Sequence, residues 1–316
     1  MYKNVLVTGG AGFIGSHVCE DLLAKNLNVI CIDDFNNYYD PKIKEDNIKE
    51  ISKNKNFKLY REDIIDLQKI ELIFQENKID AVVHLAARAG VRASIENPLI
   101  YVKTNVEGTL NMLEMSRRFK IKKFVFASSS SVYGLNKVPF SEDMNINNPI
   151  SPYAVTKLSA ELLCRTYHNL YQIPIVCLRL FTVYGPRGRP DMAPYKFMKL
   201  ILEEKELPVY GDGSSKRDYT YVSDIVYGIV AAMERDMSFE IINLGNSNPV
   251  DLKTFISILE KQTGKKAKIK QLEEQKGDVP ITYADISKAK KLLGYNPTTR
   301  LDLGIRNIVE WFLSNK

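Results

Sequence analysis

Two short stretches of the chain carry residues that together could remove hydride from an alcohol. Residues 125–132 form an apolar segment that runs into four serines, and residues 151–157 begin a predicted helix at Pro152 that contains Tyr153 and Lys157. One helical turn separates the tyrosine from the lysine, so both side chains face the same way. A phenol whose pKa is lowered by a neighbouring ammonium can act as a base near neutral pH, and a serine hydroxyl can hold the alcohol that loses its proton.

The spacing by itself is weak evidence, because a helix tyrosine at an interface, followed by an exposed lysine, gives the same pattern. The chain repeats this pattern at Tyr38/Lys42, Tyr133/Lys137 and Tyr195/Lys199. The rest of the sequence must therefore decide whether Tyr153 is catalytic.

A glycine-rich turn near the start of the chain supplies part of that context. Residues 4–8 predict an apolar strand, residues 16–25 predict a helix, and Gly9, Gly12 and Gly15 lie between them. The first glycine permits a tight turn, the second lets a pyrophosphate approach backbone N–H groups, and the third allows close packing of helix and strand. This order of elements is typical of a dinucleotide site.

The second predicted strand, residues 28–32, ends in Asp33 and Asp34. An acid at this point can bind the adenosine ribose diol and would repel a 2′-phosphate, which favours NAD over NADP. A glycine pattern alone could be an ordinary turn, but here both halves of the fingerprint are present.

The ends of the next two predicted strands add further candidates. Asp63 follows the predicted strand at residues 57–60 and would lie beside the adenine, although it could instead cap a helix at residues 67–75. The predicted strand at residues 81–85 contains His84, which we interpret as a hydrogen-bonded core histidine. Because the chain has only 3 histidines, neither a histidine mechanism nor a zinc site is indicated.

Composition predicts a soluble globular protein with a full core, since 45% of the 316 residues are apolar. The net charge is +6, and the lysine-rich runs are short and scattered, so nucleic-acid binding is not indicated. A predicted strand begins by Asn4 and no apolar run approaches ~18 residues, so neither a signal peptide nor membrane association is expected. The cysteines lack Cys-x-x-Cys spacing and are expected to be reduced core thiols of a cytoplasmic protein. They are Cys19, Cys31, Cys164 and Cys177.

Strands and helices alternate as far as residue 181, which predicts an α/β fold with a Rossmann-like, doubly wound parallel sheet. The later members of this series are a long helix at 98–119, a strand at 123–127, a helix at 152–171 and a strand at 175–180. We expect residues 1–181 to form an NAD-binding domain and residues 182–316 to form a smaller C-terminal α/β substrate domain. Residues 221–244 are expected to return to the first domain as one more helix and strand.

With these pieces in order, the whole chain resembles the extended short-chain dehydrogenase/reductases, and among them the nucleotide-sugar 4-epimerases. The matching stretches are residues 8–15, 85–87, 128–134, Tyr153-x-x-x-Lys157 and 217–224. The resemblance implies that Ser129, Tyr153 and Lys157 are catalytic and that NAD is the cofactor. The implied cofactor-binding residues are Gly9, Gly12, Phe13, Ile14, Gly15, Asp33, Asp34, Asp63, Ile64, Leu85, Ala86, Ala87, Tyr153 and Lys157.

The resemblance also suggests the type of reaction. Sugar 4,6-dehydratases and UDP-glucuronate decarboxylases are similar in fold but usually carry acidic residues where this chain has Ser130 and Ser131. Elimination of water requires an additional acid and base, whereas epimerisation at C4 of the sugar needs only the catalytic trio and a tightly held NAD. A C4 epimerase is therefore expected.

The sugar itself is suggested by residues 181–193, 89–92 and 277–285, which are similar to the UDP-glucuronate 4-epimerases. We expect Thr182 and Arg189 to hold the C6 carboxylate, because an acid in a dry pocket needs a charged or hydrogen-bonding partner; alternatively, Arg189 only braces its loop. Arg187 and Lys276 depart from the Trp and Pro common in that group. The expected UDP-sugar contacts are Arg92, Ser130, Thr182, Arg189, Arg217 and Asp278.

Two of these contacts are given specific roles by the resemblance. Arg217 would clamp the UDP diphosphate, although a surface salt bridge with Asp218 is the alternative, and Asp278 would lie near the uridine ribose. A UDP-glucose or UDP-N-acetylglucosamine 4-epimerase, a UDP-glucuronate decarboxylase and a non-catalytic NAD-binding regulator remain alternatives for the chain. By resemblance, the helices at 98–119 and 152–171 could pair in a homodimer, or their apolar faces could be covered by the sheet.

Overall fold

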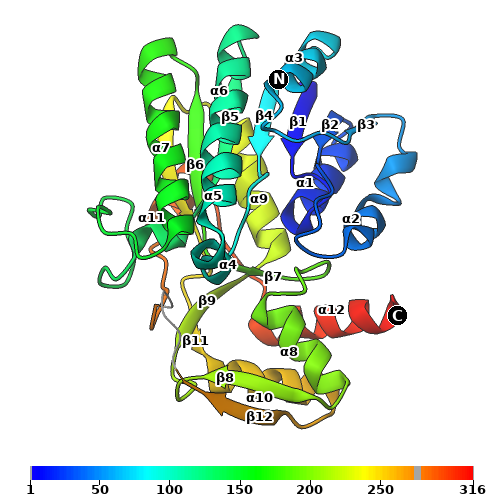
Figure 1. Ribbon diagram of the computed structural model, residues 1–316, viewed down its shortest axis with the longest axis vertical. Coiled ribbons are helices and arrows are strands. Elements are labelled where there is room, and N and C mark those ends of the chain that lie inside the picture. Colours follow the sequence, from blue (N-terminus) through cyan, green and yellow to red (C-terminus); the bar gives the residue numbers. More distant parts are fainter. Residues whose placement is uncertain (1, 274–278, 316) are drawn as a thin grey trace.

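A parallel sheet of seven strands, in the order β3-β2-β1-β4-β5-β6-β10, forms the larger part of the molecule (Figure 1). The structure is a computed structural model that describes residues 2–273 and 279–315. From β1 the chain first winds outward to β3 and then, on the other side, from β4 to β10, which confirms the predicted doubly wound fold. The strands are β1 (Asn4–Thr8), β2 (Asn28–Ile32), β3 (Phe57–Tyr60), β4 (Ala81–His84), β5 (Lys123–Ser129), β6 (Ile175–Leu180) and β10 (Phe239–Leu244).

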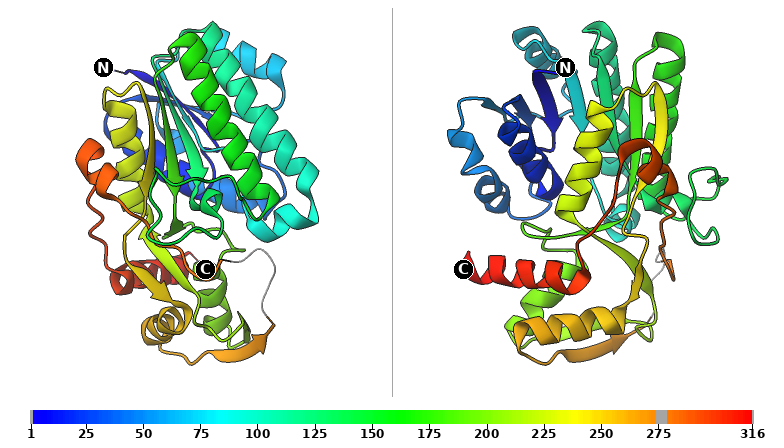
Figure 2. Two further views of the ribbon diagram at one scale, coloured as in Figure 1. Left: turned by 90° about the vertical axis from the view of Figure 1, so that its left-hand side faces the viewer. Right: turned by 180° about the vertical axis from the view of Figure 1, so that it is seen from behind.

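Helices cover both faces of this sheet (Figure 2). Alternate residues of a strand point to opposite faces, so Val5 and Val7 of β1 belong to one apolar core and Leu6 to the other. The first core is completed by α1 (Phe13–Ala24), α2 (Pro41–Ile48), α9 (Val222–Glu234) and α11 (Ser287–Leu293). The second is completed by α3 (Leu67–Glu76), α6 (Gly108–Arg118) and α7 (Pro152–Tyr171).

The long helix predicted at residues 98–119 is not a regular α-helix. It consists of α5 (Pro98–Tyr101), a π-helical segment η2 (Val102–Glu107) and α6, and it is preceded by the unforeseen short helix α4 (Val91–Glu96). A π-helical segment inserts extra backbone into a helix, and such segments often occur beside functional sites. The apolar pattern on which the prediction is based does not distinguish this segment from ordinary α-helix.

His84 is the core histidine that the sequence predicts. Its Nδ1 lies 2.7 Å from Thr8 Oγ1 and its Nε2 lies 3.0 Å from Thr109 Oγ1. Burial lowers the pKa of the imidazole to about 3, with a further contribution from the charge of Lys157. The ring is therefore neutral and ties β1 and β4 to α6 beneath the glycine loop.

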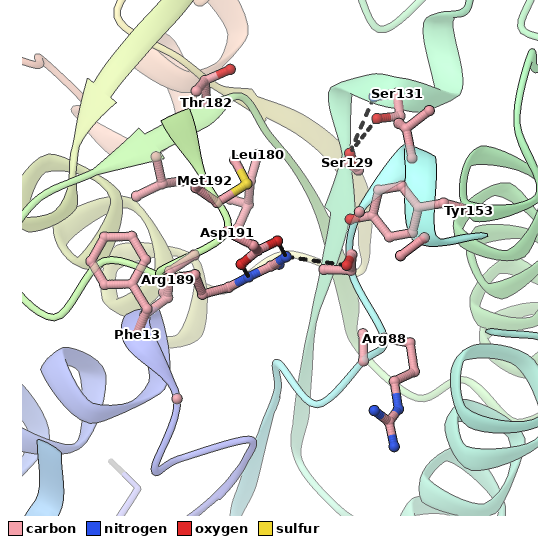
Figure 3. Close-up of a pocket in the computed structure, with 18 of the residues that line it drawn as sticks. Phe13, Arg88, Ser129, Ser131, Tyr153, Leu180, Thr182, Arg189, Asp191 and Met192 are labelled. Carbon is pink, nitrogen blue, oxygen red and sulfur yellow. Dashed lines mark hydrogen bonds and ion pairs between the residues drawn. The ribbon is translucent and has the colours of Figure 1, made fainter. Parts of the chain in front are cut away.

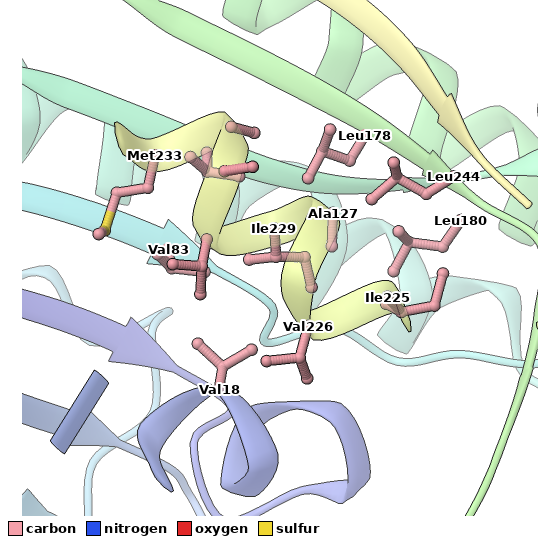
Figure 4. Packing of buried hydrophobic residues seen from close by; sticks show 14 of the residues in the cluster. Val18, Val83, Ala127, Leu178, Leu180, Ile225, Val226, Ile229, Met233 and Leu244 are labelled. Carbon is pink, nitrogen blue, oxygen red and sulfur yellow. The ribbon is translucent and has the colours of Figure 1, made fainter. Parts of the chain in front are cut away.

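A third and smaller apolar core is formed by the elements that lie below the large sheet in Figure 1. Two parallel strands, β8 (Glu206–Tyr210) and β12 (Lys268–Leu272), pack with α8 (Ala193–Leu202), α10 (Leu252–Thr263) and α12 (Leu301–Ser314). A three-stranded sheet lies between the large sheet and this smaller core. Its strands are β7 (Thr182–Tyr184), β9 (Lys216–Tyr221) and β11 (Pro249–Asp251). After β9 the chain returns to the large sheet, where α9 covers one face (Figure 4) and β10 pairs with β6.

The four cysteines are buried and form no disulfide. They are Cys19, Cys31, Cys164 and Cys177. Among residues 2–273 and 279–315, no helix has the length and apolar character needed to cross a membrane.

Candidate active site

A cavity of about 1020 Å³ lies at the carboxyl ends of the parallel strands, between the large sheet and the smaller core. Open α/β sheets bind ligands at this edge, at the point where the strand order reverses. The cavity reaches from the glycine loop after β1 to the end of β8 in the smaller core. It thus has room for a dinucleotide and a second elongated ligand placed end to end.

The glycine loop is built so that the backbone closes tightly against α1. Gly9 has φ +67°, and a side chain on it would meet the backbone of Ala86 at 2.9 Å. A Cβ on Gly15 would collide with the carbonyl oxygen of Gly9, so only glycine allows the first turn of α1 to lie against the loop. The first turn of α1, which begins at Phe13, directs backbone N–H groups into the cavity, where a diphosphate can bind. Gly12 lines the cavity as well, but its own N–H donates to the Gly9 carbonyl at 3.1 Å.

The carboxylate of Asp33 fixes this loop to the end of β2. Its Oδ2 accepts a hydrogen bond from the Ala11 backbone N–H at 3.1 Å, and its Oδ1 accepts one from Lys44 Nζ at 2.9 Å. Lys44 also lies 3.5 Å from Asp34, and both acids line the cavity. Lys44 was not predicted to lie here, and its charge offsets part of the negative charge on which the expected preference for NAD over NADP is based.

Asp63 and Ile64 line the same end of the cavity. The alternative prediction that Asp63 caps α3 is wrong, because Asp66 is the N-cap and accepts from the Lys69 N–H at 3.2 Å. Asp63 instead accepts from the Ile65 N–H at 3.1 Å, and burial raises the pKa of its carboxyl group. The three residues after β4 that were expected to contact the cofactor also line the cavity; they are Leu85, Ala86 and Ala87.

Asn105 is a positioning residue that the sequence analysis missed. It lies in the π-helical segment η2, and its side chain accepts from the Arg88 N–H at 2.7 Å and donates to the Arg88 carbonyl at 2.9 Å. It also donates to Thr156 Oγ1 at 3.0 Å, and Thr156 lies on α7 one position before Lys157. The π-helical segment therefore holds the loop after β4 against α7, and nothing in the local sequence signals this.

The start of α7 places Tyr153 and Lys157 in the cavity. Ser151 caps the helix by accepting from the Ala154 N–H at 3.2 Å, and Pro152 occupies the first turn, where its missing N–H costs nothing. Lys157 Nζ donates to the carbonyl of Ala127 at 2.7 Å. The helix thus begins where the sequence predicts, and both side chains reach the end of β5.

The electrostatics of this pair differ from the expectation. Burial raises the pKa of the Tyr153 phenol, although a hydrogen bond with Ser129 and the charge of Arg189 act in the opposite direction. Burial also lowers the pKa of Lys157 to about 8. The expectation was a phenol with a lowered pKa; in the protein alone that expectation is wrong, because removal of water outweighs the neighbouring charges.

Ser129 ends β5 beside Tyr153 (Figure 3). Its Oγ donates to Ser131 Oγ at 3.1 Å and accepts from the Ser131 backbone N–H at 3.2 Å. These contacts begin a short 3-10 turn, η3 (Ser130–Tyr133), that leaves Ser129, Ser130 and Ser131 lining the cavity. The hydroxyls provide hydrogen-bonding groups but no acid or base at this point.

A buried ion pair supports β5 and α7 on the side away from the cavity. Glu161, one turn beyond Lys157 on α7, accepts from Arg179 Nε at 3.0 Å and from its NH2 at 2.8 Å. The two side chains are 3% and 2% exposed. Ser128 donates to the same carboxylate at 2.5 Å, and Arg179 NH1 donates to Tyr133 at 3.0 Å. This network fixes β5, β6, η3 and α7 relative to one another.

Arg189 and Tyr153 face the same space from opposite walls (Figure 3). Arg189 Nε and NH2 donate to the two oxygens of Asp191 at 3.0 and 2.5 Å, and NH2 also donates to the carbonyl of Ala89 at 3.2 Å. Arg189 therefore braces its loop and lines the cavity at once. Thr182 lines the cavity too, but in Figure 3 its hydroxyl points away from the guanidinium.

The remaining expected UDP-sugar contacts are at the other end of the cavity. Arg217 lines it and donates to the Lys216 carbonyl at 2.9 Å, and Arg92 lies over the Tyr210 ring at 4.5 Å. Asp218 is fully buried and accepts three backbone N–H groups, those of Asn246, Ser247 and Ala284. The alternative of a surface salt bridge between Arg217 and Asp218 is therefore wrong. Asp278 and Lys276 lie outside the described residues.

Arg187 links the loop that follows β7 to α1. It is one of the two residues that depart from the UDP-glucuronate 4-epimerase pattern. Its NH2 donates to both oxygens of Glu20 at 2.7 Å, and its NH1 donates to Ser16 Oγ at 3.1 Å. Burial, together with the charge of Arg187, lowers the pKa of the neighbouring His17 to about 4. The loop that carries Arg189 is thus held directly against the first turns of α1.

Known proteins share this architecture over nearly the full length. A UDP-glucuronate 4-epimerase of Thermodesulfobacterium geofontis is 49% identical over 98% of this chain and 96% of its own. A crystal structure of a Bacillus cereus UDP-glucuronic acid 4-epimerase, in complex with UDP-glucuronic acid and NAD, superposes with a TM-score of 0.94 at 43% identity, covering 99% of this chain and 100% of the other.

Another similar structure is a UDP-glucose 4-epimerase of Thermotoga maritima with UDP-glucose, at 34% identity and a TM-score of 0.91, covering 99% of both chains. The family model described as GDP-mannose 4,6 dehydratase matches residues 6–308. The chain belongs to this family of extended short-chain dehydrogenase/reductases.

Proposed function

We propose that the protein is an NAD-dependent 4-epimerase that interconverts UDP-glucuronate and UDP-galacturonate. The observation that carries the substrate assignment is the position of Arg189, whose guanidinium lines the cavity across from the Tyr153 hydroxyl. A sugar whose C4 hydroxyl lies at the tyrosine could present its C6 carboxylate to this arginine, because C4 and C6 are separated by only one ring carbon. The similarity to the T. geofontis and B. cereus enzymes supports the assignment.

The residues around the glycine loop fit NAD. The N–H groups of Phe13 and Ile14 would bind the diphosphate, which can approach because Gly12 has no side chain, and Asp33 with Asp34 would bind the adenosine ribose. Asp63 and Ile64 would lie beside the adenine, and the backbone of residues 85–87 would contact the cofactor. We assign cofactor binding to residues 1–181 with 221–244, and binding of the UDP-sugar to the remainder of residues 182–316.

In the proposed reaction, Tyr153 takes the proton of the C4 hydroxyl while Ser129 holds the sugar oxygen. NAD supplies the hydride acceptor for oxidation at C4 and, once reduced, the hydride donor for the return step. The Lys157 ammonium provides the nearby positive charge that favours the phenolate over the neutral phenol. Arg217 holds the UDP diphosphate while the 4-keto sugar turns to present its other face, so no net oxidation occurs.

Two other reactions are less well supported. A neutral UDP-hexose as substrate is suggested by the T. maritima relative, and it would leave Arg189 with its partners in the protein, Asp191 and the Ala89 carbonyl. Dehydration or decarboxylation would require an acid and a base near C5 and C6. Ser130 and Ser131 occupy the corresponding wall and carry only hydroxyl groups.

The direct test is product analysis by NMR. Purified protein is incubated separately with UDP-glucuronate, UDP-glucose and UDP-N-acetylglucosamine, without added reductant. Formation of UDP-galacturonate alone would support the proposal. Conversion of a neutral sugar only would retain the epimerase mechanism and reject the uronate, and release of carbon dioxide would reject epimerisation.

Replacing Arg189 with alanine is expected to raise KM for UDP-glucuronate about 10- to 100-fold, because a charged hydrogen-bonded pair with the C6 carboxylate contributes ~1.5–3 kcal/mol. Steady-state kinetics with UDP-glucuronate and with UDP-glucose would measure this. Any turnover of the neutral sugar should change much less. Equal changes for both sugars would mean that Arg189 only braces its loop.

We further propose that the protein is a cytoplasmic homodimer. Four buried free thiols agree with a reducing compartment. Large apolar side chains are exposed along η2, α6 and α7, including Val102 at 51%, Val155 at 46% and Leu162 at 61%. Such a cluster is typical of a protein interface, and two copies could pair their α6 and α7 helices across it.

A glutamate at Leu162 is expected to separate the dimer into monomers, because an unpaired charge would be buried at the centre of the interface. Sedimentation velocity of the wild-type and variant proteins would measure their masses. Leu303→Glu on α12, which replaces a 45% exposed leucine away from these helices, is the matched control. A monomeric wild-type protein, or a variant that remains dimeric, would contradict this interface.

A further inference from the structure

The pocket that is proposed to bind a sugar carboxylate already contains a carboxylate of the protein itself. Asp191 lies two residues after Arg189 and holds its guanidinium by two hydrogen bonds, from Nε at 3.0 Å and from NH2 at 2.5 Å. This is the planar, two-point geometry in which arginine binds a carboxylate ligand. A sugar carboxylate would therefore have to share Arg189 with Asp191 or replace Asp191 on it.

The hydrogen-bonding groups of Arg189 are largely occupied. A guanidinium has five N–H donors, and a carboxylate can bind two of them along either of two edges. Asp191 takes the edge formed by Nε and NH2, while the second N–H of NH2 donates to the carbonyl of Ala89 at 3.2 Å. The other edge, formed by NH1 and NH2, therefore lacks one of its two donors. An incoming carboxylate cannot form a two-point contact on either edge unless one existing partner moves.

The two existing partners differ in their freedom to move. The carbonyl of Ala89 belongs to the backbone of the loop after β4, which Asn105 and Tyr101 hold in place by hydrogen bonds to Arg88 and Ala89. Asp191 is a single side chain that is 41% exposed, whereas Arg189 is 18% exposed. A displaced Asp191 can therefore turn into water and regain its hydration, and Arg189 stays in the wall of the cavity.

Charge leads to the same conclusion. With Asp191 in place, the pair has no net charge and suits a neutral sugar. A uronate bound beside the intact pair would place two carboxylates around one guanidinium, and at separations of ~5–6 Å like charges in a partly dry site repel strongly. If the Asp191 side chain turns away, the uronate carboxylate takes its place, and the Arg189 guanidinium is again paired with a single carboxylate.

From these observations, and resting on the proposed uronate substrate, we propose that Asp191 is a specificity-determining residue: it occupies Arg189 as a built-in competitor that a sugar carboxylate must displace. The chain thereby lowers its own affinity for a uronate while leaving its affinity for a neutral UDP-hexose unchanged. Its partner Arg189 is kept ordered and paired when no uronate is bound.

The test uses Asp191→Asn, which keeps the shape of the side chain and removes its charge. KM for UDP-glucuronate is expected to fall about tenfold, because a neutral amide competes less well for the guanidinium than a carboxylate does. The affinity for UDP alone, measured by isothermal titration calorimetry, should change less than twofold. In the Arg189→Ala background, Asp191→Asn should change KM for UDP-glucuronate less than twofold, because no arginine remains to compete for and the unpaired Asp191 side chain can turn into water.

The chain offers a matched control outside the cavity. Arg300 and Asp302 have the same spacing, with hydrogen bonds from Nε at 3.1 Å and from NH2 at 3.0 Å, on an exposed surface. Asp302→Asn therefore removes the same charge from the same kind of pair, and KM should remain as in the wild-type protein. A similar fall of KM in this variant would show that Asp191→Asn acts only through overall charge.

The outcomes separate the two proposals. Absence of UDP-galacturonate in the wild-type reaction would reject the proposed substrate and, with it, this role of Asp191. Turnover of UDP-glucuronate with an unchanged or raised KM in Asp191→Asn would leave the substrate assignment intact. It would show that Asp191 only orients Arg189, which would overturn the inference.

Discussion

Replacing Tyr153 with phenylalanine is expected to lower turnover of UDP-glucuronate by about 10²- to 10⁴-fold, the usual contribution of a positioned general base. The variant loses only the hydroxyl, whose proton-accepting role has no substitute nearby, since Ser129 and Ser131 are poor bases. Its ring should keep the contact with Tyr101, whose ring centre lies 6.2 Å away. Steady-state kinetics and calorimetric titration of NAD and UDP would measure the two effects separately.

Tyr195→Phe is the matched control for this variant. Tyr195 begins another Tyr-x-x-x-Lys pattern, but its ring packs against Trp311 and Phe312 in the smaller core. Loss of its hydroxyl should leave turnover close to that of the wild-type protein. If Tyr153→Phe also lost NAD binding or folded poorly, the residue would be structural rather than catalytic.

The second large effect is expected on stability, from the ion pair behind the catalytic strand. Glu161→Ala leaves Arg179 charged and unpaired at 2% exposure, which should lower the free energy of unfolding by about 3–5 kcal/mol. Urea unfolding of the NAD-free protein, followed by circular dichroism, would measure this loss. The reason is that a buried cation without a partner cannot recover the hydration that it lost on folding.

An exposed pair provides the comparison for this experiment. Arg61 also binds Glu45 through two hydrogen bonds, at 2.6 and 2.7 Å, but the side chains are 53% and 44% exposed. Glu45→Ala should cost no more than about 1 kcal/mol, because water and salt screen a surface pair. Equal losses for the two variants would show that burial does not determine the strength of the Glu161/Arg179 interaction.

Local sequence was sufficient for much of the fold. The predicted strands at residues 4–8, 28–32, 57–60 and 175–180 have the bounds observed in the structure. Their continuous apolar runs are what a sheet buried on both faces requires. The helix at 152–171 could be predicted as well, because a serine cap and a proline mark its first turn.

Three of the features that sequence analysis missed depend on contacts between different elements of the fold. The positioning role of Asn105 depends on its hydrogen bonds to the backbone of Arg88, which lies on another element. Lys44 was not foreseen because its partner Asp33 lies on another element. The pKa of Tyr153 could not be judged without knowing its burial, which outweighs the hydrogen bond with Ser129 and the charge of Arg189. Hydrophobic periodicity shows which side of a helix is apolar, but it does not show which elements pack against that side.

The chain leaves the large sheet after β6 and returns to it only at α9 and β10, which has a consequence for synthesis of the protein. One face of the large sheet is covered by α9, whose Ile225, Ile229 and Met233 pack on β4, β5 and β6 (Figure 4). A ribosome completes β6 at Leu180, well before α9 and β10 have been made. We therefore expect the growing chain to expose a broad apolar surface until residue 244 has emerged, and to depend on chaperones during that interval.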